Sequence, residues 1–346
     1  MKATAGEPLY GGPRLQPAHF EPDRVPVEVA RYGTDAQTLR VGSPGKVGIL
    51  ELDFELRGAS SAQRTDLVHH YQKTPLQIMR PLYYNPLRVD MPYTYVMTTG
   101  GGVLHGDRQR TDLRFGEGTS AHVTTQAHTK LYRMEHGYAA AVVNIEAEAD
   151  SYVEYLPDPV IPFAGSRYYQ RTSVTLHPDA TLITGETIYA GRLTRGEHNA
   201  YEVYASDFEV RRPGDARQQA GGLGRSPIKH GRPVAFDRVR LVPQGGHVGG
   251  LAVLDERDIV ATLYVLSPLV PAARIVEALH AAVDTVVAAS DDDRARFGVS
   301  VLPGDAGAWV RLIADDTITA LAAQTAAAAA AHELLTGRPA PVIRKS

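Results

Sequence analysis

The residues that could do chemistry gather between Thr98 and Arg133, where a glycine-rich turn ends in Asp107. The turn reads GGGVLHGD over residues 100–107, and glycine-rich turns can expose backbone N–H groups to an anion. The spacing differs from that of a phosphate-binding loop, and strand-like sequence follows instead of a helix. We therefore expect the glycines to allow a close backbone crossing, which holds Asp107 in a constrained turn.

Histidines are candidate ligands for nickel or zinc, because imidazole binds both ions. His69 and His70 are adjacent and would point to opposite faces of a strand, while His122 and His128 lie too far apart along a straight strand to share an ion. The sequence contains no cysteine, which excludes disulfides, iron–sulfur clusters and thiolate zinc sites. Any metal would meet only oxygen and imidazole ligands.

Enzyme chemistry has weaker support in the sequence. A hydrolase of the G-x-S-x-G type is excluded, because the motif is absent. A glycoside hydrolase needs two carboxyl groups, and Glu154, Asp158, Glu186 and Asp237 could supply them, although their spacing singles out no pair. On the residues alone, a β-rich glycoside hydrolase remains an alternative.

A body made mainly of β-strands must position these residues. Tyr, Gly and Pro number 17, 32 and 23, a composition that favours short strands and turns. Leu50, Leu52, Phe54 and Leu56 alternate with charged residues, which is typical of a strand with one buried face. Further strand-like runs cover 76–80, 119–126, 141–147, 151–156, 172–176, 181–189, 201–210, 234–242 and 259–266. With no helical pattern between them, we predict a stack, sandwich or coil of antiparallel strands.

Two α-helices are predicted near the C-terminus, at about 271–290 and 316–336. The first places Ile275, Leu279 and Val283 on one face, as expected of a helix that packs on a sheet. The second begins at Asp315 or Asp316, either of which can cap it, and continues through a run of alanines. Such a helix packs on its own domain or docks a partner.

Residues 1–44 are predicted to be a poorly ordered extension, because they are rich in Gly, Pro and charge without periodicity. Residues 45–340 are predicted to form one domain, followed by a tail over 341–346, and the polar, Gly-rich stretch 211–232 to be a mobile loop. The formal net charge of -3 excludes a strongly basic nucleic-acid binder. No apolar run has the length of a signal peptide or a membrane span, so we expect a cytoplasmic protein.

Seven motifs, in this order and spacing, resemble the urease accessory protein UreD family, also called UreH. They are QIMRPLYY at 77–84, GGGVLHGD at 100–107, TTQAHTKLYR at 124–133, VEYLPDPVIPFAGS at 153–166, TGETIYAGRLTRGE at 184–197, PVAFDRVRL at 233–241 and WVRLIADD at 309–316. The resemblance implies a β-superhelical body with two C-terminal helices. It also implies a maturation scaffold, not an enzyme, that binds apo-urease and links it to UreF and, through UreF, to the GTPase UreG.

The resemblance further implies an interior tunnel through which Ni²⁺ passes transiently, with no tightly bound cofactor. Carried over by local motif, its acidic residues are Asp107, Glu186 and Asp237, and Thr129 lines it. His105 stands where the family usually has glycine, and it could add a ligand beside Asp107. A scaffold with the same fold and no ion path is the remaining alternative.

Overall fold

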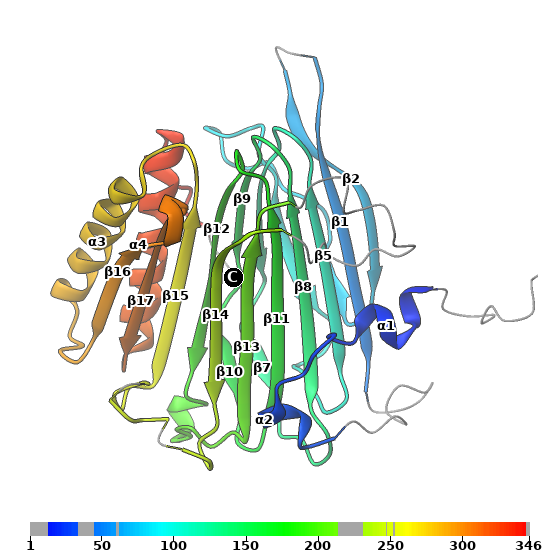
Figure 1. Ribbon diagram of the computed structural model, residues 1–346, viewed down its shortest axis with the longest axis vertical. Coiled ribbons are helices and arrows are strands. Elements are labelled where there is room, and N and C mark those ends of the chain that lie inside the picture. Colours follow the sequence, from blue (N-terminus) through cyan, green and yellow to red (C-terminus); the bar gives the residue numbers. More distant parts are fainter. Residues whose placement is uncertain are drawn as a thin grey trace, which may run out of the picture.

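Two large β-sheets face each other and make up most of the molecule (Figure 1). The computed structural model describes residues 13–33, 45–59, 62–213, 231–246, 248–251 and 253–343. The first sheet has seven strands in the order β14-β13-β11-β8-β5-β1-β2. Their bounds are β1 Val47–Arg57, β2 Arg64–Lys73, β5 Arg108–Phe115, β8 Ala139–Ala147, β11 Arg167–Leu176, β13 Val203–Arg211 and β14 Pro233–Leu241.

The second sheet has ten strands, eight of them in the order β16-β17-β15-β12-β9-β6-β4-β3. The other two, β7 and β10, pair with each other, and β10 also pairs with β12. The bounds are β3 Leu76–Gln77, β4 Tyr93–Thr98, β6 Ser120–Thr125, β7 Thr129–Leu131, β9 Tyr152–Leu156, β10 Val160–Pro162, β12 Thr181–Tyr189, β15 Ile259–Leu266, β16 Arg296–Val301 and β17 Gly307–Ala314. Each stretch predicted as a strand contains one, so the mainly β class is confirmed.

The prediction of an antiparallel body is wrong, because both sheets are mixed. Strands β1, β5, β8, β11 and β13 run parallel to their neighbours in the first sheet, as do β4, β6, β9 and β12 in the second. Antiparallel pairs lie toward the sheet edges. The chain alternates between the sheets from β4 to β13, so the crossover that a parallel pair needs is a strand of the opposite sheet and not a helix.

The main core fills the space between the two sheets. Leu50, Leu52 and Phe54 of β1 point inward as their alternation predicts, and each is at most 1% exposed. Phe54 stacks on Phe115 of the neighbouring β5, with ring centroids 5.2 Å apart. The polar side of the same strands faces outward, so the inner faces are free to enclose both the core and the cavities described below.

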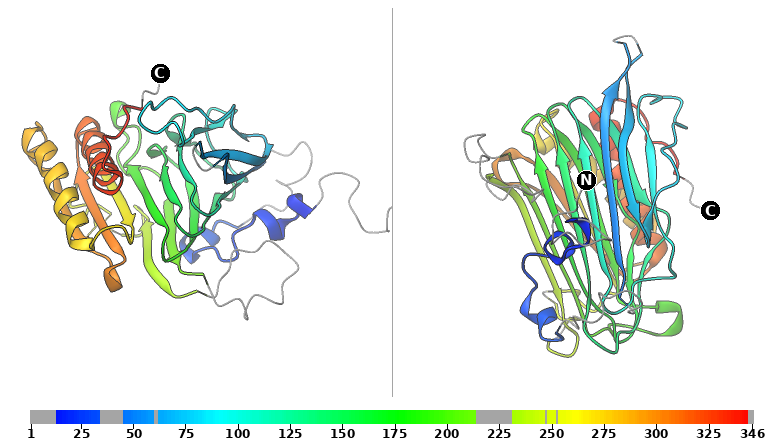
Figure 2. Two further views of the ribbon diagram at one scale, coloured as in Figure 1. Left: turned by 90° about the horizontal axis from the view of Figure 1, so that it is seen from above. Right: turned by 90° about the vertical axis from the view of Figure 1, so that its right-hand side faces the viewer.

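Helices α3 (Ala272–Ala289) and α4 (Thr317–Thr336) confirm the two C-terminal helices, and both lie beside β15, β16 and β17 (Figures 1 and 2). Asp316 caps α4 by accepting a hydrogen bond from the N–H of Thr319, as predicted. Ala320, Ala323 and Ala327 are buried against the second sheet, so α4 packs on its own fold. The hairpin of β16 and β17 between the helices was not predicted.

Part of the N-terminal segment is built into the structure, which corrects the prediction of a poorly ordered extension. Residues 13–33 form a 3₁₀ turn, Pro13–Leu15, and two short helices, α1 (Pro17–Phe20) and α2 (Val27–Ala30). They lie on the outer face of the first sheet (Figure 2). Phe20 and Val29 are 2% and 0% exposed, so two apolar side chains anchor the segment. Residues 1–12 and 34–44 are outside the described ranges.

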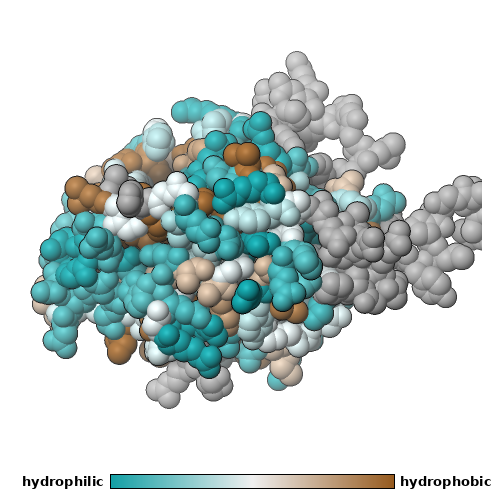
Figure 3. All heavy atoms as spheres, turned by 90° about the horizontal axis from the view of Figure 1, so that it is seen from below, coloured by the Kyte–Doolittle hydropathy of each residue, from teal (hydrophilic) through white to brown (hydrophobic). Residues whose placement is uncertain are grey.

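The predicted loop 211–232 begins at the end of β13, and its residues 214–230 are also outside the described ranges. Short 3₁₀ turns at Leu193–Arg195 and Pro303–Asp305 complete the helical elements of the described chain. None of the described helices has the length and apolar character needed to cross a lipid bilayer. The face shown in Figure 3 is mainly hydrophilic, with hydrophobic residues in separate spots.

Candidate functional site

A cavity of about 260 Å³ lies between the sheets and brings three of the predicted site residues together. Asp107, Thr129 and Glu186 all line it, although they are far apart in the sequence. Asp107 directly precedes β5, Thr129 begins β7 and Glu186 lies on β12. The coiling of the chain between the sheets therefore makes one site out of three separate motifs.

Asp107 is held tightly by the backbone around it. Its Oδ1 accepts a hydrogen bond of 2.8 Å from the N–H of Lys46, and its Oδ2 accepts one of 2.9 Å from the N–H of Leu104. The side chain is 2% exposed, and this burial raises the pKa of Asp107 above its ordinary value. The constrained turn predicted for Asp107 is thus present, and both oxygens already serve it. Gly106, at φ 75°, supplies the left-handed conformation that the turn needs.

Glu186 sits in a different environment, among neutral donors. Its Oε1 accepts hydrogen bonds from the Tyr204 hydroxyl at 2.7 Å and the Gln170 amide at 3.3 Å, and its Oε2 accepts one from the Ser206 hydroxyl at 2.8 Å. Burial raises the pKa of Glu186, and the negative charge of Asp237 raises it further. The carboxylate has no cation in hydrogen-bond contact, which is costly for a buried charge and favours binding of a positive ion.

A second cavity, of about 40 Å³, connects Glu186 to Asp237. It shares Tyr155, Gln170 and Glu186 with the first cavity. Both acids line it, so a small ion leaving Glu186 would meet Asp237 next.

A third cavity, of about 370 Å³, continues from Asp237 and is lined by Phe236, Trp309 and Arg311 among others. Asp237 accepts a hydrogen bond of 2.6 Å from the Tyr264 hydroxyl and forms an ion pair with Arg311. Phe236 is 52% exposed, so this end of the series is close to the surface. An ion would bind Asp237 only by loosening its pair with Arg311.

His105 does not line any of these three cavities. Its ring lies edge-on to that of His136, with centroids 6.1 Å apart. The suggestion that His105 adds a ligand beside Asp107 therefore has no support in this geometry, even though the positive charge of a protonated His105 acts on Asp107.

Several residues of the site were not predicted from the sequence. Tyr204 and Ser206 lie two positions apart on β13, so both point into the sandwich, and Gln170 occupies the same face of β11. Polar residues at inward positions of strands are a signal that could have identified them. Locating the inward face, however, required the pairing of both strands.

Glu154, one of the acids considered for glycoside hydrolysis, lies away from the cavities in a buried cluster. Its Oε2 is 2.6 Å from Nδ1 of His122, and its Oε1 is 2.6 Å from Nδ1 of His332 and accepts a 2.7 Å hydrogen bond from the Tyr152 hydroxyl. Burial alone would raise the pKa of Glu154, but His122 and His332 outweigh it and hold the pKa well below its ordinary value. Glu154 is therefore a structural acid that ties α4 to β6 and β9.

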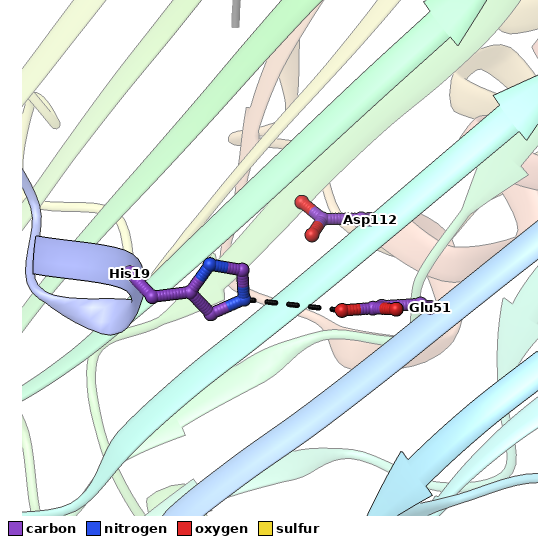
Figure 4. Close-up of side chains that lie close together, drawn as sticks. All are labelled: His19, Glu51 and Asp112. Carbon is purple, nitrogen blue, oxygen red and sulfur yellow. Dashed lines mark ion pairs between the residues drawn. The ribbon is translucent and has the colours of Figure 1, made fainter. Parts of the chain in front are cut away.

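A cluster of His19, Glu51 and Asp112 has the composition of a metal site, with one ligand atom from each residue lying within 4.8 Å of the others (Figure 4). Arg14 donates to both oxygens of Glu51 at 2.8 Å, and Arg110 donates to Asp112 at 2.7 Å. Two guanidinium groups thus balance two carboxylates and leave no net negative charge for a divalent cation. We interpret the cluster as an anchor for the N-terminal segment.

Comparisons with known proteins agree with the motifs. A family model described as UreD urease accessory protein matches residues 46–346. Urease accessory protein UreD 2 of Streptomyces griseus is 50% identical over 319 residues, covering 92% of this chain and 100% of its own. Urease accessory protein UreD of Haloarcula marismortui is 36% identical over 315 residues, with coverages of 91% and 96%. UreD 3 of Methylorubrum populi is 34% identical over 292 residues, with coverages of 84% and 86%.

Proposed function

The chain belongs to the UreD urease accessory protein family, and on this premise we propose that it is a maturation chaperone that binds apo-urease and helps to deliver Ni²⁺ to its active site. The family consists of accessory proteins rather than enzymes, and its role is in urease maturation. The cavity residues are accordingly assigned to holding and passing an ion. As the motif resemblance implies, the proposed partners also include UreF and, through it, the GTPase UreG.

The environment of Glu186 is the observation that carries the proposed ion path. This carboxylate lines two adjoining cavities and is balanced only by neutral hydrogen-bond donors. A structural acid in a protein interior normally has a cationic partner, as Asp237 has in Arg311. Glu186 therefore has the strongest electrostatic reason to accept a passing cation.

Oxygen ligands also suit transient binding. Carboxylates, hydroxyls and water hold Ni²⁺ less firmly than imidazole or thiolate, and a conduit requires sites that release the ion as well as bind it. Asp107, Glu186 and Asp237 offer such ligands along the three cavities. Arg311 beside Asp237 would favour release at the third cavity, because its positive charge competes with the ion.

The proposal is tested by co-expressing urease subunits and the other accessory proteins with Glu186→Gln, and measuring the nickel content and activity of the purified urease. We expect both to fall about tenfold at limiting nickel, the order of loss typical when a metal-site acid is neutralised. Copurification with apo-urease should be retained. The matched control is Glu55→Gln, since the Glu55 side chain is 57% exposed and pairs only with Arg57 in the described structure.

Two results separate the chaperone from its ion path. Full nickel occupancy of urease in cells that lack this chain would refute the chaperone function itself. Normal activation by Glu186→Gln would leave the chaperone function standing and refute passage past Glu186. The second result would favour a scaffold that has the same fold and no ion path.

A further inference from the structure

His128 and Asp158 line the first cavity together with Asp107 and Glu186, and neither belongs to the proposed ion path. His128 is exposed, as are the two residues before it, so this part of the lining lies at the mouth of the cavity. We infer that His128 and Asp158 form a loading site where a hydrated divalent cation is captured before it enters the path. This inference rests on the proposed function, since it concerns the entrance to the same path.

The fold places the two residues on neighbouring segments. Strands β7 and β10 pair in parallel, with Thr129 opposite Val160, and the N–H of Thr129 donates to the carbonyl of Pro159 at 3.0 Å. His128 and Asp158 immediately precede these paired positions. The hydroxyl of Thr125 fixes Asp158 by donating to its Oδ2 at 3.0 Å and accepting from its backbone N–H at 2.8 Å. The carboxylate is thereby held at the cavity wall.

The chain also bends where the sequence analysis assumed a straight strand. Strand β6 ends at Thr125 and β7 begins at Thr129, with a bend over residues 126–128. The earlier reason for rejecting His128, its distance from His122 along one strand, therefore does not apply. His128 turns out to share the cavity with carboxylates of other strands.

Tyr189 supplies an independent observation at the same place. Its ring lies against that of His128, with centroids 5.9 Å apart, and its side chain is only 5% exposed. Its hydroxyl has no hydrogen-bond partner among the described residues, which is costly for a buried polar group. Burial raises the pKa of Tyr189 to about 12, and Asp158 adds to the shift, so the neutral hydroxyl and that carboxylate lie close together. A water of the hydrated ion would satisfy the hydroxyl.

The ligand types suggest which ion the mouth selects. An imidazole with a carboxylate and water suits Ni²⁺ or Zn²⁺ better than Mg²⁺, which prefers oxygen ligands alone. The acids further inside offer only oxygen, so an ion would pass from a selective entrance to weaker interior sites. Lys46 and Lys130 also line this cavity and limit how firmly a cation is held, which suits a site that must release its ion.

The test uses cells that co-express urease with all of its accessory proteins, grown over a graded series of nickel concentrations. We expect His128→Ala to raise the nickel concentration for half-maximal urease activation by about tenfold, while activation at saturating nickel stays normal. Asp158→Asn should act in the same direction. His105→Ala is the matched control, because His105 is a histidine of the neighbouring turn that does not line the cavities.

The outcomes keep the inference apart from the proposed function. A nickel response equal to the wild type in His128→Ala, together with impaired activation by Glu186→Gln, would overturn the loading site and leave the ion path in place. Impaired activation by His128→Ala at saturating nickel as well would also overturn it, since a loading site matters only when nickel is scarce. Normal activation by all three variants would refute path and loading site together.

Discussion

The acids of the proposed path differ in what their oxygens already do. Both oxygens of Asp107 accept backbone hydrogen bonds, so Asp107 shapes its turn whether or not an ion passes. Asp237 is paired with Arg311, whereas Glu186 has only neutral partners. Replacing Glu186 therefore tests ion passage most cleanly, because replacing Asp107 would also leave two backbone donors unpaired.

Glu186→Gln should keep or increase the thermal stability of the protein at pH 7. The folded-state pKa of Glu186 is raised by burial, so its ionised form costs stability in the folded state. That cost is absent below the ordinary carboxyl pKa and grows as the pH rises through the raised folded-state value. The difference in melting temperature between variant and wild type should therefore widen from pH 4 to pH 8 in circular-dichroism melts.

A clear loss of stability in Glu186→Gln at pH 7 would contradict this assignment. It would show that the hydrogen bonds from Tyr204 and Ser206 outweigh the cost of the buried charge. The exposed Glu55→Gln serves again as the control, and its melting temperature should be unchanged over the same pH range.

At the scale of elements, α4 is fastened to the second sheet by two means. Its small alanine side chains allow close packing on β15 and β17. Near its C-terminal end, His332 reaches the buried Glu154 on β9, which also holds His122 on β6. The side chains of His122 and His332 are both 2% exposed, so this polar contact is fully inside the protein.

Glu154→Gln should destabilise the protein by about 3–5 kcal/mol, the usual cost of removing one partner from a buried charged network. The pKa of Glu154 is held well below its ordinary value, so its stabilisation is present above the ordinary carboxyl pKa and is lost as the pH falls through the depressed value. Urea denaturation at pH 7 measures the loss. A cost below about 1 kcal/mol would mean that the alanine packing alone holds α4.

The N-terminal segment is held to the first sheet mainly by buried side chains and ion pairs. Val29 of α2 is fully buried against Tyr169 and Val203, and Arg108 pairs with Glu21 at 2.8 Å. The family model begins at residue 46, so this ordered segment precedes the matched residues. It covers outward-facing polar residues of β1 and β5 that would otherwise meet water.

Val29→Ala should lower the free energy of unfolding by about 2 kcal/mol, through lost apolar burial and the small cavity that remains. Val27→Ala on the same helix is the matched control, since Val27 is 75% exposed and its replacement should change little. Urea denaturation of the full chain gives both values. Equal effects of the two variants would show that the segment is not anchored through Val29.

For the whole molecule, the two-sheet coil explains how one path can gather acids from distant motifs. Each pass of the chain adds one strand to each sheet, and the inner faces of successive strands enclose the series of cavities. Helices α3 and α4 lie beside β15–β17 at one end of the second sheet and leave the interior to the strands (Figure 1). The proposed path therefore depends on the fold as a whole.

The amino-acid sequence by itself determined the strands, the two C-terminal helices, the cap at Asp316 and the family motifs. Alternation, helix periodicity and capping depend on residues only a few positions apart, so they can be recognised locally. Tertiary structure alone decided that the sheets are mixed, that Glu154 is tied to two histidines and that His128 joins the cavity. These features depend on strands distant in sequence being brought together, and local patterns do not specify which strands pair or which inner faces meet.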